Sequence, residues 1–199
     1  MNIKLHAAVD CVDGRAGHIT GVVVEPKEQK ITHLVVKMHG TEYIVPLSLL
    51  KDEEYDGVIL ACTKEELRAQ QPFEETDYIR TPVDAVEFLP GYTAYARHTE
   101  AEMVPVEHEN LPYGEVEIRV GMPVFSKDGA RVGHVAEIAL DTMSGRFTHF
   151  LMAHRRLLGE KGFVVGGWQL QSITEDGIYL KADKDEIALL PTMTLKHHA

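Results

Sequence analysis

The sequence has little cysteine and no long hydrophobic run. Its 199 residues include two cysteines, Cys11 and Cys62, and no CxxC pair. A disulfide framework is therefore not predicted, and a reducing cytosol is the expected compartment. No apolar stretch approaches the roughly 18 residues that a membrane-spanning helix needs. The first residues, MNIKLHAAVD, lack the apolar core of a signal peptide. These absences predict a soluble, cytoplasmic protein without a membrane span.

Positive charge is also scarce. The chain has 20 Lys and Arg residues against 31 Asp and Glu residues, so its formal net charge is −11 with neutral histidines. Its longest basic run is the pair Arg155-Arg156. A negative field repels nucleic acids and anionic membranes. Direct nucleic-acid binding is therefore not expected, whereas a basic protein partner is compatible with this charge.

Sequence motifs of catalysis and of nucleotide binding are missing. The chain contains no GxSxG, no GxGxxG and no P-loop. Carboxylate pairs such as Glu65-Glu66 are frequent, but with this many acidic residues they are expected on a hydrated surface. Cys11 and Cys62 are expected to be buried, unreactive thiols. We therefore expect a protein that is not an enzyme and has no cofactor.

The chain contains an internal repeat. A shift of 116 positions superimposes two Gly-His and two Thr-His pairs, and an insertion of four residues in the second copy then raises the shift to 120. The matched blocks are Gly17-His18 with Gly133-His134, Thr32-His33 with Thr148-His149, residues 43–45 with 163–165, and residues 56–58 with 176–178. Several matched blocks in the same order predict two copies of one unit.

Each copy has the pattern of a small β structure that ends in a helix. Short runs rich in β-branched residues are separated by Asp-Gly pairs at 13–14, 56–57, 128–129 and 176–177. Thr63 and Glu66 in TKEEL form a capping box, and DKDEI repeats it with Asp183 as the cap. The predicted boundaries are 1–73 for the first repeat, 74–116 for a connecting segment with prolines and aromatics, 117–193 for the second repeat and 194–199 for a tail. Part of the connecting segment is expected to lie on the repeats.

These phrases resemble a known family. The second copy reads DG..VGHV....D...GRFTHFLMAHRRLLGEKGFVVGGWQL..I..DGIYLKADKDEIALLP, and the first reads DGRAGHITGVVVEPKEQKITHLVVKMHGTEYIVPLSLL, followed by DGVIL and TKEEL. Both are similar to the PRC-barrel domain, which occurs in the cytoplasmic part of the photosynthetic reaction centre H subunit and at the C-terminus of the RimM ribosome-maturation factor. The resemblance implies a mainly β fold of two tandem small β-barrels, each ending in a short helix and related by a pseudo-two-fold axis.

The resemblance also implies a function. It predicts a non-enzymatic adaptor or scaffold that binds other proteins, for a photosynthetic or electron-transfer complex or for a ribonucleoprotein assembly. Neither catalytic residues nor a cofactor come with it. The protein partner is not identified by the sequence, and assembly into a homo-oligomer is an alternative.

Four histidines occupy matched positions in the two copies. They are His18 with His134, and His33 with His149. Facing imidazoles can bind a metal such as zinc or titrate near neutral pH. The alternative function is therefore a small-ligand, metal or pH sensor. A place in the repeated strand explains the same pattern without a ligand, and a structural role is the expected one.

The strand that contains Thr-His is apolar on both faces. Strict alternation places Ile31, His33 and Val35 on one face, and Thr32, Leu34 and Val36 on the other. The second copy repeats this pattern with Phe147, His149 and Leu151 against Thr148, Phe150 and Met152. The outer face therefore needs a cover, for which the terminal helix, the other barrel and a second chain are the alternatives.

The insertion in the second copy is a candidate docking loop for a partner. It contains Arg155, Arg156, Leu157 and Leu158. Two arginines and two leucines on an acidic protein suit protein recognition. The alternative is an ordinary loop whose leucines close the end of the barrel.

Overall fold

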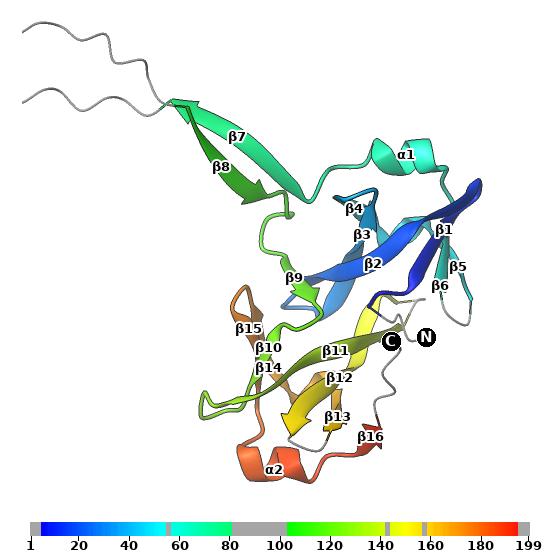
Figure 1. Cartoon of the computed structure of the whole chain (residues 1–199). Helices are drawn as coiled ribbons and strands as arrows, with labels where there is room; N and C mark the ends of the chain where they lie inside the picture. Colours follow the sequence, from blue (N-terminus) through cyan, green and yellow to red (C-terminus); the bar gives the residue numbers. More distant parts are fainter. Residues whose placement is uncertain (1–4, 55–56, 81–102, 142–143, 157–158, 195–199) are drawn as a thin grey trace, which may run out of the picture. The chain divides into compact units, whose positions relative to one another are not determined.

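The computed structural model describes residues 5–54, 57–80, 103–141, 144–156 and 159–194. The chain divides into two compact units, of which the larger contains Met1–Phe73 and Leu111–Ala199 and the smaller contains Glu74–Asn110. The described residues form sixteen β-strands and two short α-helices (Figure 1). The predicted mainly β fold is therefore confirmed. No helix in this described part of the chain is long and apolar enough to cross a membrane.

Within the larger unit we call residues 5–73 the first half, 111–119 the returning segment and 120–194 the second half. The first half contains β1 (Ala8–Cys11), β2 (Gly14–Glu25), β3 (Lys30–Met38), β4 (Thr41–Pro46), the 3-10 helix η1 (Leu47–Leu49), β5 (Leu50–Glu54), β6 (Gly57–Leu60) and α1 (Lys64–Arg68). The returning segment contains β9 (Val116–Arg119). The second half contains β10 (Pro123–Phe125), β11 (Arg131–Asp141), β12 (Arg146–Arg156), β13 (Gly159–Gly166), the 3-10 helix η2 (Gly167–Gln169), β14 (Leu170–Thr174), β15 (Gly177–Leu180), α2 (Lys184–Ala188) and β16 (Thr192–Thr194).

The strands of the two halves pair in the same order. In the first half, β1 is antiparallel to β2 and parallel to β6, while β2, β3 and β4 follow one another in antiparallel pairs. In the second half, β10 is antiparallel to β11 and parallel to β15, and β11, β12 and β13 are antiparallel neighbours. All of these strands belong to one 14-stranded sheet, and the parallel closing pair after antiparallel hairpins gives each half of it a barrel-like form.

Four β-bulges interrupt the ladders of each half. In the first half, the residues without an opposite partner are Ala16, Thr20, Thr32 and Lys51. Their counterparts in the second half are, in the same order, Val132, Ala136, Thr148 and Gln171. A bulge bends its strand and increases the local twist. These bulges let long strands such as β2 and β11 curl around a small core.

The bulge at Thr32 corrects the predicted faces of β3. Strict alternation put Ile31 on the face of His33 and Val35, but Ile31 lies in the same buried cluster as Leu34 and Val36. The inserted residue shifts the alternation by one position, because Val23 pairs with His33 while Val24 pairs with Ile31.

The same correction applies to β12. Phe147 lies in one cluster with Phe150 and Met152 and not on the face of His149. There Ala139 pairs with His149 while Leu140 pairs with Phe147, which leaves Thr148 as the inserted residue.

Both predicted capping boxes are confirmed. The Glu66 backbone N–H donates to Thr63 Oγ1 (3.2 Å), and the Thr63 N–H donates to Glu66 Oε2 (2.8 Å). At α2 the Glu186 N–H donates to Asp183 Oδ1 (2.9 Å), and the Asp183 N–H donates to Glu186 Oε2 (3.0 Å). Each short helix buries one aliphatic side chain, Leu67 in α1 or Ile187 in α2, in the core.

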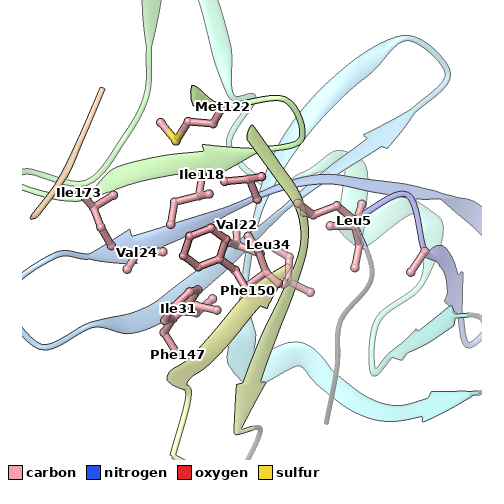
Figure 2. Close-up of a cluster of buried hydrophobic side chains, with 14 of the residues drawn as sticks. Leu5, Val22, Val24, Ile31, Leu34, Ile118, Met122, Phe147, Phe150 and Ile173 are labelled. Carbon is pink, nitrogen blue, oxygen red and sulfur yellow. The ribbon is translucent and has the colours of Figure 1, made fainter. Parts of the chain in front are cut away.

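One hydrophobic core runs through both halves. The cluster joins first-half residues such as Val22 and Leu34 to Ile118 of the returning segment and to Phe147 and Phe150 of the second half. Figure 2 shows the two phenylalanine rings among the aliphatic side chains of β2 and β3. Burial of this shared apolar surface is the main force that holds the halves together.

A short ladder also joins the halves. Lys30 at the start of β3 pairs with Arg146 at the start of β12 in antiparallel register. The Ile31 N–H donates to the Gly145 carbonyl (2.8 Å), and the Phe147 N–H donates to the Gln29 carbonyl (2.9 Å).

The returning segment lies on the first half. Its strand β9 adds to β2 in antiparallel register, from Gly21 opposite Arg119 to Val24 opposite Val116. Since residues 111–116 belong to the predicted connecting segment, the expected packing on a repeat is found for its last part.

The outer face of β3 has an intramolecular cover in the first half. Val23, Val35 and Ile44 form a second buried cluster with Phe73, and Leu111 packs against it. Arg119 lies over the Phe73 ring, 5.8 Å from its centroid. The cover is therefore the chain that follows α1, together with the returning segment, and not the terminal helix itself.

The smaller unit is a hairpin of β7 (Glu74–Arg80) and β8 (Met103–Glu109). The two strands pair in antiparallel register from Glu74 opposite Glu109 to Arg80 opposite Met103. Beyond the hairpin end, Asn110 Nδ2 donates to Glu75 Oε2 at 3.2 Å.

Candidate functional site

The repeated Thr-His pair marks a bulge in each half. Thr32 Oγ1 donates to the Val23 carbonyl at 3.3 Å, and Thr148 Oγ1 donates to the Ala139 carbonyl at 3.1 Å. In both pairs the histidine Nδ1 lies within hydrogen-bond distance of the threonine Oγ1, at 2.9 Å in the first half and 3.1 Å in the second. Because a bulge disrupts the ladder, the hydroxyl supplies a donor to a backbone acceptor beside it. The Thr-His motif therefore has a structural role in both halves, in which the threonine hydroxyl binds a backbone carbonyl beside the bulge.

His33 has a further neighbour in the returning segment. The single proton of the Thr32 hydroxyl is shared between the Val23 carbonyl and Glu115 Oε2, which lies 2.5 Å from Thr32 Oγ1 and 3.6 Å from His33 Nδ1. Hydrogen bonds to a carboxylate are stronger than those between neutral groups. This contact therefore connects the returning segment to β3.

The histidines of one half do not converge. His33 pairs with Val23 on β2, five residues along that strand from His18, which corresponds to about 16 Å. In the second half, His149 pairs with Ala139 on β11, which is likewise five residues along that strand from His134. His18 instead lies near His6, with the ring centroids 6.1 Å apart. The described residues contain no group of three or more His, Cys, Asp or Glu suited to a metal ion. Metal binding stays a prediction from sequence.

The candidate docking loop lies in the β12–β13 hairpin. Arg155 pairs with Glu160 and Arg156 with Gly159 along the ladder. Leu157 and Leu158 lie outside the described residues. The corresponding first-half hairpin is shorter, since Met38 of β3 already pairs with Thr41 of β4. The four additional residues thus lengthen one hairpin of the second half.

Two cavities lie at the 3-10 helices. One, of about 470 Å³, spans both halves and is lined by Lys30, Ile31, Thr32, Pro46, Leu47, Ser48, Ser144 and Gly145. The other, of about 300 Å³, lies in the second half beside Trp168 and Glu186. Trp168 is not among the candidate residues predicted from the sequence. A sequence signal for it exists, because Gly166-Gly167-Trp168 aligns with Pro46-Leu47-Ser48 when the sequence is shifted by 120 positions.

The two cysteines are buried close to each other, so their predicted burial is confirmed. Cys11 ends β1 and Cys62 follows β6, where the Val12 N–H donates to the Cys62 carbonyl at 3.1 Å. Burial, followed by the neighbouring Cys62, raises the pKa of the Cys11 thiol to about 12. Burial also raises the pKa of Cys62. Both thiols are therefore uncharged at neutral pH, and a neutral thiol is a poor nucleophile.

The second half of the larger unit has a barrel-like β form, with the capped helix α2 near its end. Its residues 120–187 match the family model of the PRC-barrel domain. This match confirms, for this stretch, the resemblance to the PRC-barrel domain that the sequence predicted. The matched stretch begins directly after β9 and ends in α2. None of the curated proteins matches the chain.

Proposed function

We propose that the chain is a tandem of two PRC-barrel units and acts as a non-enzymatic adaptor or scaffold for other proteins. The family match covers residues 120–187 of the second half. We propose that the first half is a second unit of the same kind. The same order of strand pairing and the matched bulges support this extension.

The observation that supports the tandem arrangement best is the pairing of Lys30 with Arg146. These residues are separated by 116 positions, the shift of the internal repeat. The same shift exchanges the two flanking hydrogen bonds, from the Ile31 N–H to the Gly145 carbonyl and from the Phe147 N–H to the Gln29 carbonyl. Contacts in which each residue meets its own counterpart are typical of a two-fold axis between like units. This supports a pseudo-two-fold relation within one chain.

An adaptor role follows from the way the two units differ. They share one core, so each holds the other in place, and function then depends on what their surfaces present. The second half has two features without a first-half counterpart, the longer β12–β13 hairpin and Trp168. The net charge of −11 suits a basic partner. A photosynthetic, electron-transfer or ribonucleoprotein assembly stays a prediction from the family resemblance.

A second candidate function is a pH sensor, and the contact of His33 with Glu115 favours it. Protonation of His33 would strengthen its attraction to Glu115 and tighten the returning segment on β3. The test follows the His33 ring signals by NMR against pH in the wild type and in Glu115→Gln. A sensor requires the β9 amide signals to titrate together with His33 in the wild type. If they stay fixed while His33 titrates, the sensor is contradicted.

The adaptor is tested by capture of partners and by binding of the purified pair. A tagged chain is crosslinked mildly in native lysate, bound proteins are identified by mass spectrometry, and each candidate is purified for calorimetric titration. The variant R155E/R156E tests the docking loop. The variant K51E/R68E is its control, because it changes the net charge equally in the first half, where both side chains are exposed.

We expect a partner that binds the wild type and the control but not R155E/R156E. A partner that binds all three supports the adaptor and contradicts the docking loop. If no candidate binds the purified chain, the adaptor is contradicted.

A further inference from the structure

The pocket between η2 and α2 contains an exposed aromatic side chain. Trp168, Gln169, Lys181, Ala182 and Glu186 line this cavity of about 300 Å³. Trp168 is 77% exposed, and it is the single tryptophan of the chain. A large exposed aromatic beside a cavity is a common feature of recognition sites.

The indole is held in place although it is exposed. A Cβ atom added to Gly166 would lie 2.5 Å from Trp168 Nε1, so the ring rests against the Gly166 backbone. The Gly166 N–H donates to Oε1 of the buried Gln169 at 2.9 Å. The Lys181 Nζ donates to the Trp168 carbonyl at 3.0 Å. A side chain fixed before binding loses little conformational entropy when a partner arrives.

The fold does not require this tryptophan. The corresponding first-half residues are Pro46 and Ser48, and η1 forms there without an aromatic residue. Trp168 and Gly166 differ from their counterparts together, and the glycine leaves the space that the indole occupies. The two differences are thus complementary, which indicates a surface specific to the second half.

The chemistry of the lining points to a cation. Glu186 places a carboxylate at the pocket, and its Oε2 accepts from the Asp183 N–H at 3.0 Å, which fixes the side chain. An aromatic face beside a carboxylate attracts ammonium and guanidinium groups. Lys181 also lines the pocket, but its ammonium group is bonded to the Trp168 carbonyl. The overall charge of −11 attracts basic partners to the surface.

We propose that this pocket binds an arginine or lysine side chain from a basic segment of a protein partner. The inference rests on the proposed adaptor function and names the chemistry of the partner. The guest cation lies between the indole of Trp168 and the carboxylate of Glu186. The aliphatic part of its side chain covers the exposed indole.

The test uses two capped peptides, acetyl-Ala-Arg-Ala-amide and the same peptide with citrulline, which has the shape of arginine without its charge. Tryptophan fluorescence of the full chain reports on this pocket alone, because Trp168 is the single tryptophan. We expect saturable binding of the arginine peptide and at least about threefold weaker binding of the citrulline peptide, as for an exposed cation–π contact.

Three variants test whether the arginine peptide binds in this pocket. E186Q keeps a capping side chain, since glutamine also serves in capping boxes, and it should weaken arginine binding about threefold, as for one exposed ion pair. D185N removes a neighbouring charge of α2 that does not line the pocket, and it should leave binding unchanged. W168S introduces the first-half residue, and calorimetry should show loss of binding while the circular dichroism spectrum is retained.

Equal affinity for arginine and citrulline would overturn the proposal, and so would equal weakening by E186Q and D185N. Tighter binding of a leucine peptide would overturn it in favour of an apolar guest. A captured partner that binds W168S as well as wild type leaves the adaptor intact and overturns this pocket as its docking site. Arginine binding with no partner in the capture experiment supports the pocket and contradicts the adaptor.

Discussion

At the residue scale, Thr32 and Thr148 test the structural role of the Thr-His pair. Thr148→Val removes the hydroxyl that donates to the Ala139 carbonyl, which should cost about 1 kcal/mol, as for a typical hydrogen bond. Thr32→Val should cost more, because the Thr32 hydroxyl shares its single proton between the Val23 carbonyl and the carboxylate of Glu115, a stronger acceptor. Urea unfolding measures both changes. The Ser variants keep the hydroxyl and are the controls. If the Val variants unfold at the wild-type urea concentration, the hydroxyls do not stabilise the bulges.

A second prediction at this scale concerns pH and the Cys11 thiol. Folding raises its pKa from the ordinary value of 9.0 to about 12, through burial first and Cys62 second. The unfolded chain therefore loses this proton at lower pH than the folded chain does. The stabilising contribution is complete below pH 9 and is lost as the pH rises from about 9 towards 12.

The control for this prediction is Cys11→Ser, which copies Ser126 at the corresponding position of the second half. The free energy of unfolding is measured from pH 7 to pH 11 for both proteins. The wild type should lose stability more steeply than C11S above pH 9. Parallel curves would show that Cys11 ionises normally in the folded protein.

At the element scale, the capping boxes should stabilise α1 and α2 independently of the sheets. Thr63→Ala should cost about 1 kcal/mol, the usual loss for a helix cap, whereas Thr63→Ser should cost little. Hydrogen bonds from the Thr63 N–H and hydroxyl lower the pKa of Glu66. The stabilisation from Glu66 is therefore present above pH 4.5 and is lost as the pH falls below it.

Denaturant unfolding at pH 7 and at pH 3 checks the capping prediction. The difference between wild type and Glu66→Ala should shrink at pH 3, where the carboxyl is protonated. An unchanged difference would mean that Glu66 acts through packing and not as a charged acceptor.

The elements also show how far sequence patterns can predict this fold. The helices were predictable because a capping box is local, and Thr63 and Glu66 lie three residues apart. The faces of β3 and β12 were not predictable from the sequence. Alternation assumes that successive residues point to opposite faces, and the inserted bulge residue, Thr32 in β3 and Thr148 in β12, shifts that alternation by one position. The addition of β9 to β2 joins residues that are distant in sequence, for which no local pattern exists.

The candidate sites were less predictable than the fold. A residue that recurs in both halves, such as His33, is a natural candidate for a functional site. Its recurrence is equally explained by a structural role that both halves need in order to fold. Trp168 differs from its counterpart Ser48, and only the structure places its indole against the Gly166 backbone and in one pocket with Glu186. The binding site that we propose therefore rests on a departure from the internal repeat, which a search for repeated residues does not select.

At the scale of the whole molecule, the shared core determines how the larger unit unfolds. Phe150 of β12 is fully buried in the cluster that contains β2 and β3 side chains. Phe73 is fully buried as well, but it belongs to the separate cluster on the outer face of the first half. Substitution of Phe73 therefore perturbs the first half, and substitution of Phe150 perturbs the second half. The effect of each substitution on the other half measures the coupling between the halves.

We predict that the halves unfold as one cooperative unit, because neither keeps its apolar face buried when the other opens. Phe150→Ala and Phe73→Ala should each cost about 3–5 kcal/mol. Native-state hydrogen exchange should show the amides of β3 and of β12 losing the same protection in either variant. If Phe73→Ala lowers protection in β3 alone, the halves open separately. Equal loss in both strands would mean that the larger unit presents its docking surfaces in one fixed arrangement, as a scaffold requires.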